Sequence, residues 1–178
     1  ATGRDTMQQD VPSDTSAGLD SSIFLQVIEK GDVQDRLRLA EQLAGFLANE
    51  AEPSEERALA VPAALQLMAD PEFEVRATLA RGLVDARDLD ADLLFAIIAD
   101  EDEIALPFLS LTPSLSHWHM LAVLRVGDEM RQGCVAMRPD ISEEAIDYIV
   151  DAPTLAVSML LFENDVITLT PGHLRRLY

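Results

Sequence analysis

The chain is poor in the residues from which metal and redox sites are usually built. Of its 178 residues, one is cysteine and three are histidine. A single cysteine excludes a disulfide within the chain and a zinc site made of cysteines. Cys134 stands in the stretch EMRQGCVAM, among apolar neighbours. This setting favours a small buried side chain over a reactive thiol.

Basic residues are also scarce. The chain holds 13 Lys and Arg against 32 Asp and Glu, so its net charge is −19. Nucleic-acid binding needs cations that neutralise phosphates, and an anionic membrane surface would repel the protein, so neither partner is expected. A basic protein partner would be attracted. Solubility, or life in a salty medium, explains the same charge, and both interpretations stay open.

Long hydrophobic runs are absent as well. The longest spans residues 93–98, six residues, whereas a membrane-spanning helix needs about 18. The N-terminus has no charged-then-apolar signal pattern, so we expect a cytoplasmic protein. Aromatic residues make up only 5% of the chain. An interior built from Leu, Ile, Val, Ala and Met is more typical of packed helices than of a β-sandwich.

What the sequence does contain is a repeated helix start. An apolar residue precedes a good N-cap at four places, and the caps are 26, 26 and 28 residues apart: Leu89-Asp90, Leu115-Ser116, Ile141-Ser142 and Leu169-Thr170. Four residues after the caps stand Leu94, Met120, Ile146 and Leu174. An apolar residue before the cap and another four residues after it form a hydrophobic staple. We therefore predict four helices that bury the same face.

A second, shorter helix is expected before three of these starts. Its apolar residues would be Ile104/Phe108/Leu111, Met130/Cys134/Met137 and Leu155/Met159/Phe162. Prolines 113 and 139 stand in the connectors that follow the first two, where proline prevents the helix from continuing. Asn164, after the third, is suited to end a helix in a left-handed conformation.

A longer repeat comes earlier in the chain. DVQDRLRLAEQL and EFEVRATLARGL align forty residues apart, with Arg36 opposite Arg76. We predict that these arginines, and Arg138 in a connector, join adjacent repeats by pairing with carboxylates; anion binding is the alternative. Asp70-Pro71 is expected to begin a helix, and Pro62 to kink or divide the preceding one.

These patterns predict an all-α protein. A disordered tail at residues 1–19 would precede a helical repeat domain at residues 20–178, which we expect to be an α-solenoid of short helix pairs. An irregular compact helical bundle is the alternative, because pairs of 26 residues are short. The helix that begins after Thr170 has only eight residues, and no polar capping helix follows it in the sequence to cover its apolar side. We therefore expect further repeats beyond the C-terminus, or a homodimer that covers this open end.

The stretch DPEFEVRATLARGL resembles the first helix of a HEAT repeat. From about residue 75 onward, VRATLARGL, LPFLSLTPSLS, AMRPDIS and LLFENDVITLT are similar to a bacterial family of HEAT-like proteins of unknown function. The resemblance implies a helical repeat fold and brings no catalytic residue. The helices of the second half are shorter than in standard HEAT repeats and lack the Asp-Val-Arg signature.

The stretch SLSHWHML holds two of the three histidines and the only tryptophan. His117 and His119 are two residues apart, about 200° around a helix, so they are badly placed to bind one metal ion. His119 and His173 both stand three residues after a cap, so we interpret them as structural surface histidines. Trp118 stands two residues after its cap and should be partly exposed. His117 and Trp118 are therefore candidate contacts for a partner, unless Trp118 folds over the neighbouring helix pair.

The acidic run at residues 100–103 invites comparison with a calcium site. It lacks the alternating ligands and the glycine of an EF-hand loop. Carboxylates at a helix start also complement the helix dipole, so a solvated loop is the favoured interpretation over a cation site.

No glycine-rich phosphate loop, nucleophile elbow or HExxH motif is present in the sequence. We predict a non-catalytic scaffold, with no catalytic residue, metal or cofactor, that acts as a regulatory or signalling module. Its partner would be a basic or hydrophobic protein or peptide. An enzyme or small-ligand sensor with a pocket between helices is the alternative, and it would use His117, His119 or Cys134.

Overall fold

The computed structural model describes residues 21–49, 52–152 and 154–177, so the predicted tail at 1–19 lies outside it. The described residues form helices and no strand, which confirms the all-α prediction. The helices are α1 (Ser21–Lys30), α2 (Val33–Asn49), α3 (Glu55–Leu67), α4 (Phe73–Leu83), α5 (Ala91–Ile98), α6 (Asp102–Leu111), α7 (His117–Val126), α8 (Glu129–Ala136), α9 (Glu143–Asp151), α10 (Leu155–Glu163) and α11 (Pro171–Leu177).

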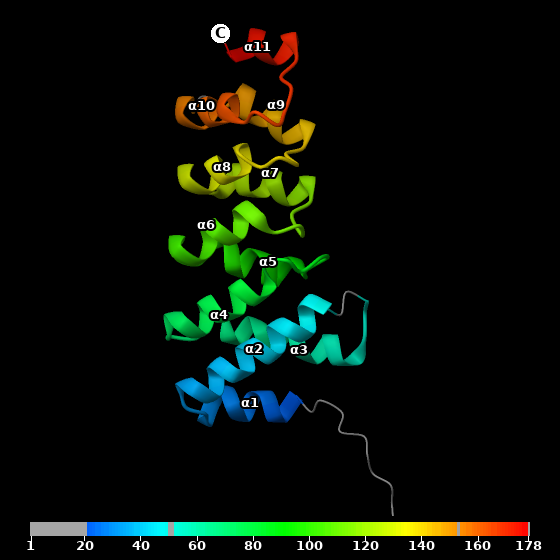
Figure 1. Cartoon of the computed structure of the whole chain (residues 1–178), viewed down its shortest axis with the longest axis vertical. Helices are drawn as coiled ribbons and strands as arrows, with labels where there is room; N and C mark the ends of the chain where they lie inside the picture. Colours follow the sequence, from blue (N-terminus) through cyan, green and yellow to red (C-terminus); the bar gives the residue numbers. More distant parts are fainter. Residues whose placement is uncertain (1–20, 50–51, 153, 178) are drawn as a thin grey trace, which may run out of the picture.

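The helices are stacked along the long axis of the molecule in chain order (Figure 1). Even-numbered helices pack on one another from α2 to α10 without a break. Among odd-numbered helices, α1 packs on α3, α3 on α5, α7 on α9 and α9 on α11, whereas α5 and α7 scarcely touch. The connectors before α5, α7, α9 and α11 all lie along one edge of the column (Figure 1).

The predicted staple residues are buried in three of the four cases. Leu94, Met120 and Ile146 are 0%, 2% and 7% exposed and belong to one core cluster that runs through the stack. The prediction was wrong for Leu174, which is 39% exposed. In the short helix α11 the buried residue is His173 instead, because its side chain packs toward Asp147 of α9.

The shorter helices bury less of their predicted stripes. Ile104 and Phe108 of α6 are buried, but Met130 of α8 and Met137, which caps the end of α8, are exposed. All three residues predicted for α10 are exposed: Leu155, Met159 and Phe162. In α10 the buried residues are Val157, Ser158 and Leu161, so the prediction chose the wrong side of this helix. An apolar helix such as α10 has no polar face from which periodicity could select the buried side.

The structure corrects two local predictions. Pro62 does not divide α3, which continues through it. The residue that loses a helical partner is Ala58, which is exposed, so water can reach its carbonyl. Asp70 does not begin α4: one of its oxygens accepts from Glu72 N–H and the other from Arg36. The first turn of α4 therefore starts at Phe73.

Arginines join successive connectors, as predicted for Arg36 and Arg76. Arg36 Nε donates to Asp70 Oδ2 at 2.7 Å. Arg76 Nε lies 3.0 Å from Asp100 Oδ2, and its Nη1 donates to the carbonyl of Asp70 at 2.9 Å. Each arginine therefore connects the helix that carries it to the next helix pair along the chain.

A second series of contacts joins the connectors that follow even-numbered helices. These connectors lie at the edge of the column opposite to the arginine contacts. Ser114 Oγ donates to the Ala86 carbonyl at 2.6 Å. Asn164 Nδ2 donates to the carbonyls of Ala136 and Arg138, each at 2.9 Å. Asn164 has a φ of −73°, so the predicted left-handed helix end was wrong. Its amide satisfies the carbonyls of the preceding repeat instead.

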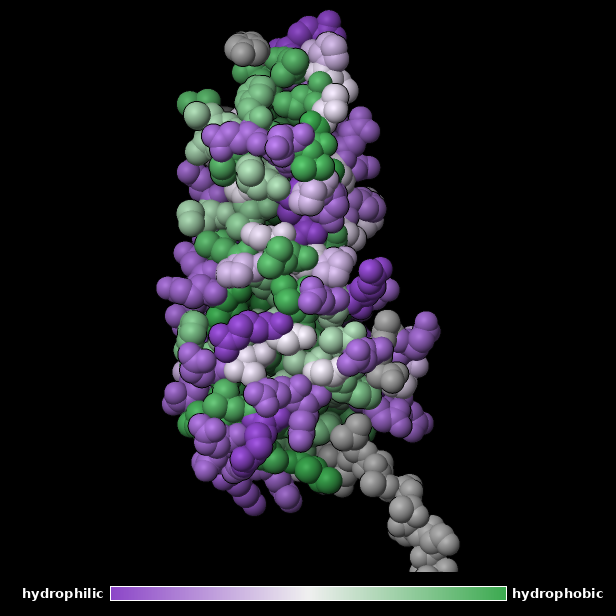
Figure 2. All heavy atoms as spheres, viewed as in Figure 1, coloured by the Kyte–Doolittle hydropathy of each residue, from purple (hydrophilic) through white to green (hydrophobic). Residues whose placement is uncertain are grey.

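The surface is divided by polarity. Figure 2 shows hydrophilic side chains along both sides of the column and hydrophobic ones between them in its upper half. None of the described helices is long and apolar enough to cross a lipid bilayer.

Candidate functional site

The SLSHWHML stretch begins a helix, as predicted. Ser116 is the N-cap of α7, and its Oγ accepts from the backbone N–H of His119 at 3.4 Å. In return, His119 Nδ1 accepts from Ser116 N–H at 3.2 Å. This reciprocal pair is a capping box in which histidine takes the place of the usual Glu or Gln. His119 therefore has a structural role at the start of the helix.

The start of α11 repeats this arrangement. Thr170 N–H donates to His173 Nδ1 at 3.1 Å, and His173 N–H donates to Thr170 Oγ1 at 3.2 Å. The equivalence with His119 was predicted, but the surface position was not correct: His173 is buried and His119 is half-buried. The Nε2 atom of His173 lies 3.3 Å from Asp147 Oδ1. Both ring nitrogens are thus occupied by the protein.

Asp147 binds α9 to α11 and makes their contact sensitive to acid. A hydrogen bond from Arg176 lowers the pKa of the Asp147 carboxyl, and the charge of Arg176 and the nearby His173 act in the same direction against the effect of partial burial. Because the pKa is lower in the folded state, this contact stabilises the fold above the ordinary aspartate pKa, about 4. The stabilisation is lost as pH falls through the lowered value.

We expect Asp147→Asn to destabilise the protein by about 0.5–1 kcal/mol at pH 7, a small effect because the pair is half-exposed. The difference from the unsubstituted protein should shrink as pH falls below about 4, because the carboxyl is then protonated first in the unfolded chain and, at its lowered pKa, in the folded protein. Urea unfolding of both proteins between pH 7 and pH 3 measures this. An equal difference at every pH would contradict the assignment of the pKa shift to folding.

Trp118 is exposed, and this part of the prediction is confirmed. Its exposed fraction is 70%, so it does not fold over the neighbouring helix pair. The ring of His117 lies 4.6 Å from the indole, centroid to centroid, at an interplanar angle of 42°. His117 thus stands beside the tryptophan on the surface, whereas His119 turns inward and meets the ring of Phe95 edge-on at 5.4 Å.

A groove runs between α5 and α7, where the packing of the odd-numbered helices is interrupted. It measures about 460 Å³ and is lined by Phe95, Ile98, Ala99, Val123, Val126, Gly127, Asp128 and Arg131. Val126 is 86% exposed. Trp118 and Val126 are eight residues apart, so their side chains are about 80° apart around α7 and about 12 Å apart along its axis. We call Trp118 and this groove together the α5–α7 surface.

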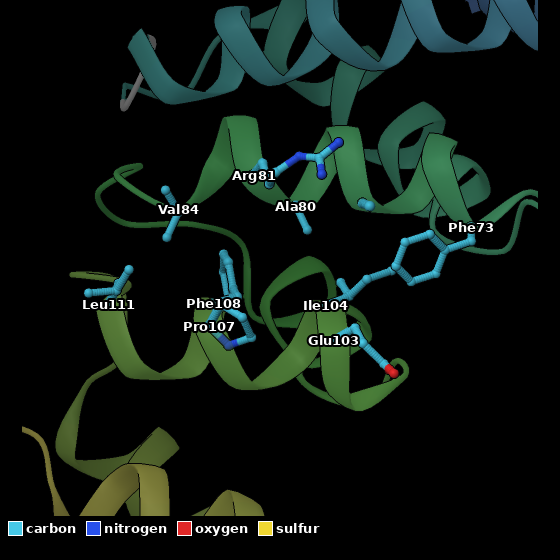
Figure 3. A pocket seen from close by; sticks show the side chains of 10 residues that line it. Phe73, Ala80, Arg81, Val84, Glu103, Ile104, Pro107, Phe108 and Leu111 are labelled. Carbon is cyan, nitrogen blue, oxygen red and sulfur yellow. The ribbon is translucent and has the colours of Figure 1, made fainter.

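A second groove lies between α4 and α6, on the even-numbered row. It is smaller, about 240 Å³, and is lined mainly by apolar side chains. Val84 and Leu111 lie at one end and Phe73 at the other (Figure 3). Its rim carries one charge of each sign, Arg81 and Glu103.

Neither groove is lined by a histidine or a cysteine. Cys134 is half-buried, and its Sγ lies 3.9 Å from the Leu106 carbonyl. Within the described ranges, no three His, Cys, Asp or Glu side chains are arranged to hold a metal ion.

The acidic run at 100–103 is bound by arginines. Asp100 and Glu101 pair with Arg76, at 3.0 and 2.6 Å, and these hydrogen bonds raise the pKa of the Arg76 guanidinium. Asp102 pairs with Arg131 at 2.9 Å, and Arg131 also donates to the carbonyls of Ile98 and Asp100. Three of the four carboxylates thus have partners within the protein. Arg131 also pairs with Asp128 at 2.7 Å. Sequence reasoning missed its role at the acidic run, because those partners lie about thirty residues away.

Arg57 was missed in the same way. Its Nη2 donates to Asp90 Oδ2 at 2.9 Å. Asp90, which was predicted to cap α5, makes no side-chain cap hydrogen bond there, since its carboxylate is turned to this arginine.

Comparison with models of known protein families, with curated proteins and with solved structures found no match to the chain.

Proposed function

We propose that the chain is an α-solenoid of short HEAT-like helix pairs and acts as a non-catalytic scaffold that binds a protein or peptide partner. The stacking of alternate helices supports this fold, because each row extends by adding one helix at a time. The bacterial HEAT-like resemblance of the sequence points in the same direction.

The α5–α7 surface is the observation that carries the proposed function. An exposed tryptophan and an open apolar groove occur on the same two helices, where the odd row is least tightly packed. Tryptophan is enriched among the residues that dominate binding energy at protein interfaces. Exposed apolar surface beside a groove is typical of an interaction site.

Site-specific photocrosslinking in cells of the source organism tests the function. We expect p-benzoylphenylalanine at Val126 to give a discrete adduct with one protein, and the same group at the exposed Arg87 to give none. The captured protein, once purified, should bind the scaffold directly. Trp118→Ala should weaken that binding at least tenfold, about 1.4 kcal/mol.

Leu111→Ala is the matched control. It removes an exposed apolar side chain from the α4–α6 groove, so binding at the α5–α7 surface should not change. Equal crosslinking from positions 126 and 87, or loss of binding with Leu111→Ala alone, would contradict the assignment of function to the α5–α7 surface.

A further inference from the structure

Trp118 stands in a row of exposed acidic residues. The second residue of each odd-numbered helix from α3 to α9 is exposed, and in order these are Glu56, Asp92, Trp118 and Glu144. α7 packs on α9, and the ring contact between Phe95 and His119 places the middle of α5 beside the first turn of α7. These helices begin at the same edge of the column (Figure 1), so the first turn of α7, which carries Trp118, follows that of α5, which carries Asp92, and precedes that of α9, which carries Glu144.

The carboxylates of this row are available to an external cation. Asp92 and Glu144 form no ion pair with any residue in the described ranges, whereas Asp100, Asp102 and Asp147 are all bound to arginines. The arginines thus neutralise Asp100, Asp102 and Asp147 but leave Asp92 and Glu144 unpaired.

The charge of the surrounding chain reinforces this polarity. Residues 102–165 contain eleven Asp and Glu but only three Arg, so their net charge is 3 − 11 = −8. Two of those arginines, Arg131 and Arg138, keep only 12% and 4% of their side chains exposed. A partner that approaches α5, α7 and α9 therefore meets a field of one sign.

An exposed indole between two carboxylates is suited to a guanidinium or ammonium group. Cations are attracted to the face of an aromatic ring, and tryptophan is the strongest of the aromatic partners. α7 packs on α9, and packed helices lie about 8–10 Å apart, so Glu144 is near enough to attract a further cation. Asp92 adds to the same negative field from α5. His117 stands against the indole and limits the orientations that it can take.

The two ends of the α5–α7 surface have different chemistry. The Trp118 end is acidic and aromatic, and the groove end, about 12 Å away along α7, is apolar. We propose that the partner is a basic amphipathic helix, with Arg or Lys side chains over Trp118 between Asp92 and Glu144, and apolar side chains two turns further along in the groove. This inference rests on the proposed function and specifies the chemistry of the partner.

A second copy of the chain is the less suitable occupant. It would bring another −19 charges to an acidic face, and such repulsion opposes association. Sedimentation of the protein alone tests this directly: a dimer that Val126→Asp dissociates would overturn the proposal.

The binding test uses a fluorescein-labelled helical peptide of fourteen residues, with arginines in its first turn and leucines in its third turn on the same face. Fluorescence anisotropy gives its Kd. The emission of Trp118, the only tryptophan, reports directly on whether the peptide reaches this residue. We expect binding that weakens as salt is added, with a change in Trp118 emission.

Paired variants locate the cationic contact. Asp92→Asn with Glu144→Gln should raise the Kd at least tenfold and reduce its salt dependence. Glu129→Gln with Glu163→Gln removes the same charge from exposed residues of the even row, and should change the Kd less than threefold. Equal effects of the two pairs would overturn the proposal, because they would indicate only a general attraction.

Two further peptides separate this inference from the proposed function. If a peptide with Glu in place of Arg binds equally well and remains sensitive to Val126→Asp, the surface binds protein segments but the basic partner is wrong. If the Arg–Leu peptide fails to bind at about millimolar concentration, the inference of a basic amphipathic partner is wrong. The proposed function is tested separately, by crosslinking at position 126. A peptide with Ser in place of Leu should bind at least fivefold more weakly.

Discussion

Arg138→Met is expected to lower the free energy of unfolding by about 3–5 kcal/mol, a large part of the stability of an ordinary domain. The guanidinium lies between two repeats and is 4% exposed. Its Nη1 donates to the Leu109 carbonyl and its Nη2 to the Thr112 carbonyl, both at 2.7 Å. Leu109 and Thr112 are fully buried. Methionine fills a similar space but leaves both carbonyls without a donor, and water cannot replace it.

Because of Asp140, the stabilisation by Arg138 depends on the planar shape of the guanidinium and not only on its charge. Its two oxygens accept from Arg138 Nε and Nη2 at 2.8 and 2.9 Å, so the guanidinium is held from both sides. Arg138→Lys should therefore also destabilise the protein, by about 2 kcal/mol, because one ammonium cannot meet all these acceptors.

Urea unfolding followed by far-ultraviolet circular dichroism measures these changes, with Arg87→Met as the control. Arg87 is exposed, and the same substitution there should change the free energy of unfolding by less than about 0.5 kcal/mol. If Arg138→Met also falls within this range, the contact between the two connectors does not stabilise the fold.

Gly82→Ala should destabilise the protein by about 2 kcal/mol, although alanine is the better helix former. Gly82 lies in α4 where it meets α2, and a Cβ added to it would be 2.5 Å from the Cβ of Ala44. Ala44 is 1% exposed, and its Cβ is attached directly to the backbone, so it cannot rotate away. The two helices would have to separate, and Arg36, which bridges α2 to the connector before α4, would be displaced with them.

Gly45→Ala is the matched control from the facing helix. A Cβ at Gly45 would meet nothing within 4 Å, so this substitution should stabilise the protein by about 0.5–1 kcal/mol through helix propensity alone. Opposite signs for the two glycines are the expected result. The double variant Ala44→Gly/Gly82→Ala should recover part of the loss, since it returns the missing space. Equal signs for Gly45→Ala and Gly82→Ala, measured by thermal unfolding, would contradict the close approach of α2 and α4.

Features that act within one turn of helix were largely predictable. Ser116 and Thr170 cap their helices because a hydroxyl three residues before a backbone N–H reaches it whatever surrounds the chain. The equivalence of His119 and His173 followed from their shared distance to these caps. Burial of Leu94, Met120 and Ile146 was predictable too, since a staple places its apolar residue toward the core.

Only part of the candidate site could be predicted from the sequence. The sequence indicated that Trp118 is exposed, because the second residue after the N-cap, where Trp118 stands, is Asp or Glu in the neighbouring odd-numbered helices. The groove beside it was not predictable. It lies where α5 and α7 make few contacts, and no local sequence pattern determines how closely two helices pack.

The sequence by itself determined that this protein is helical, where most of its helices begin, and that its surface is acidic, because capping, proline geometry and charge are properties of short segments. Only the tertiary structure decided which side of α10 is covered, which acids each arginine neutralises, and which carboxylates remain open beside Trp118. Long side chains such as those of Arg76 and Arg138 select partners across 24 to 29 residues of chain. That selection depends on how helices stack, since the partners become neighbours only after packing.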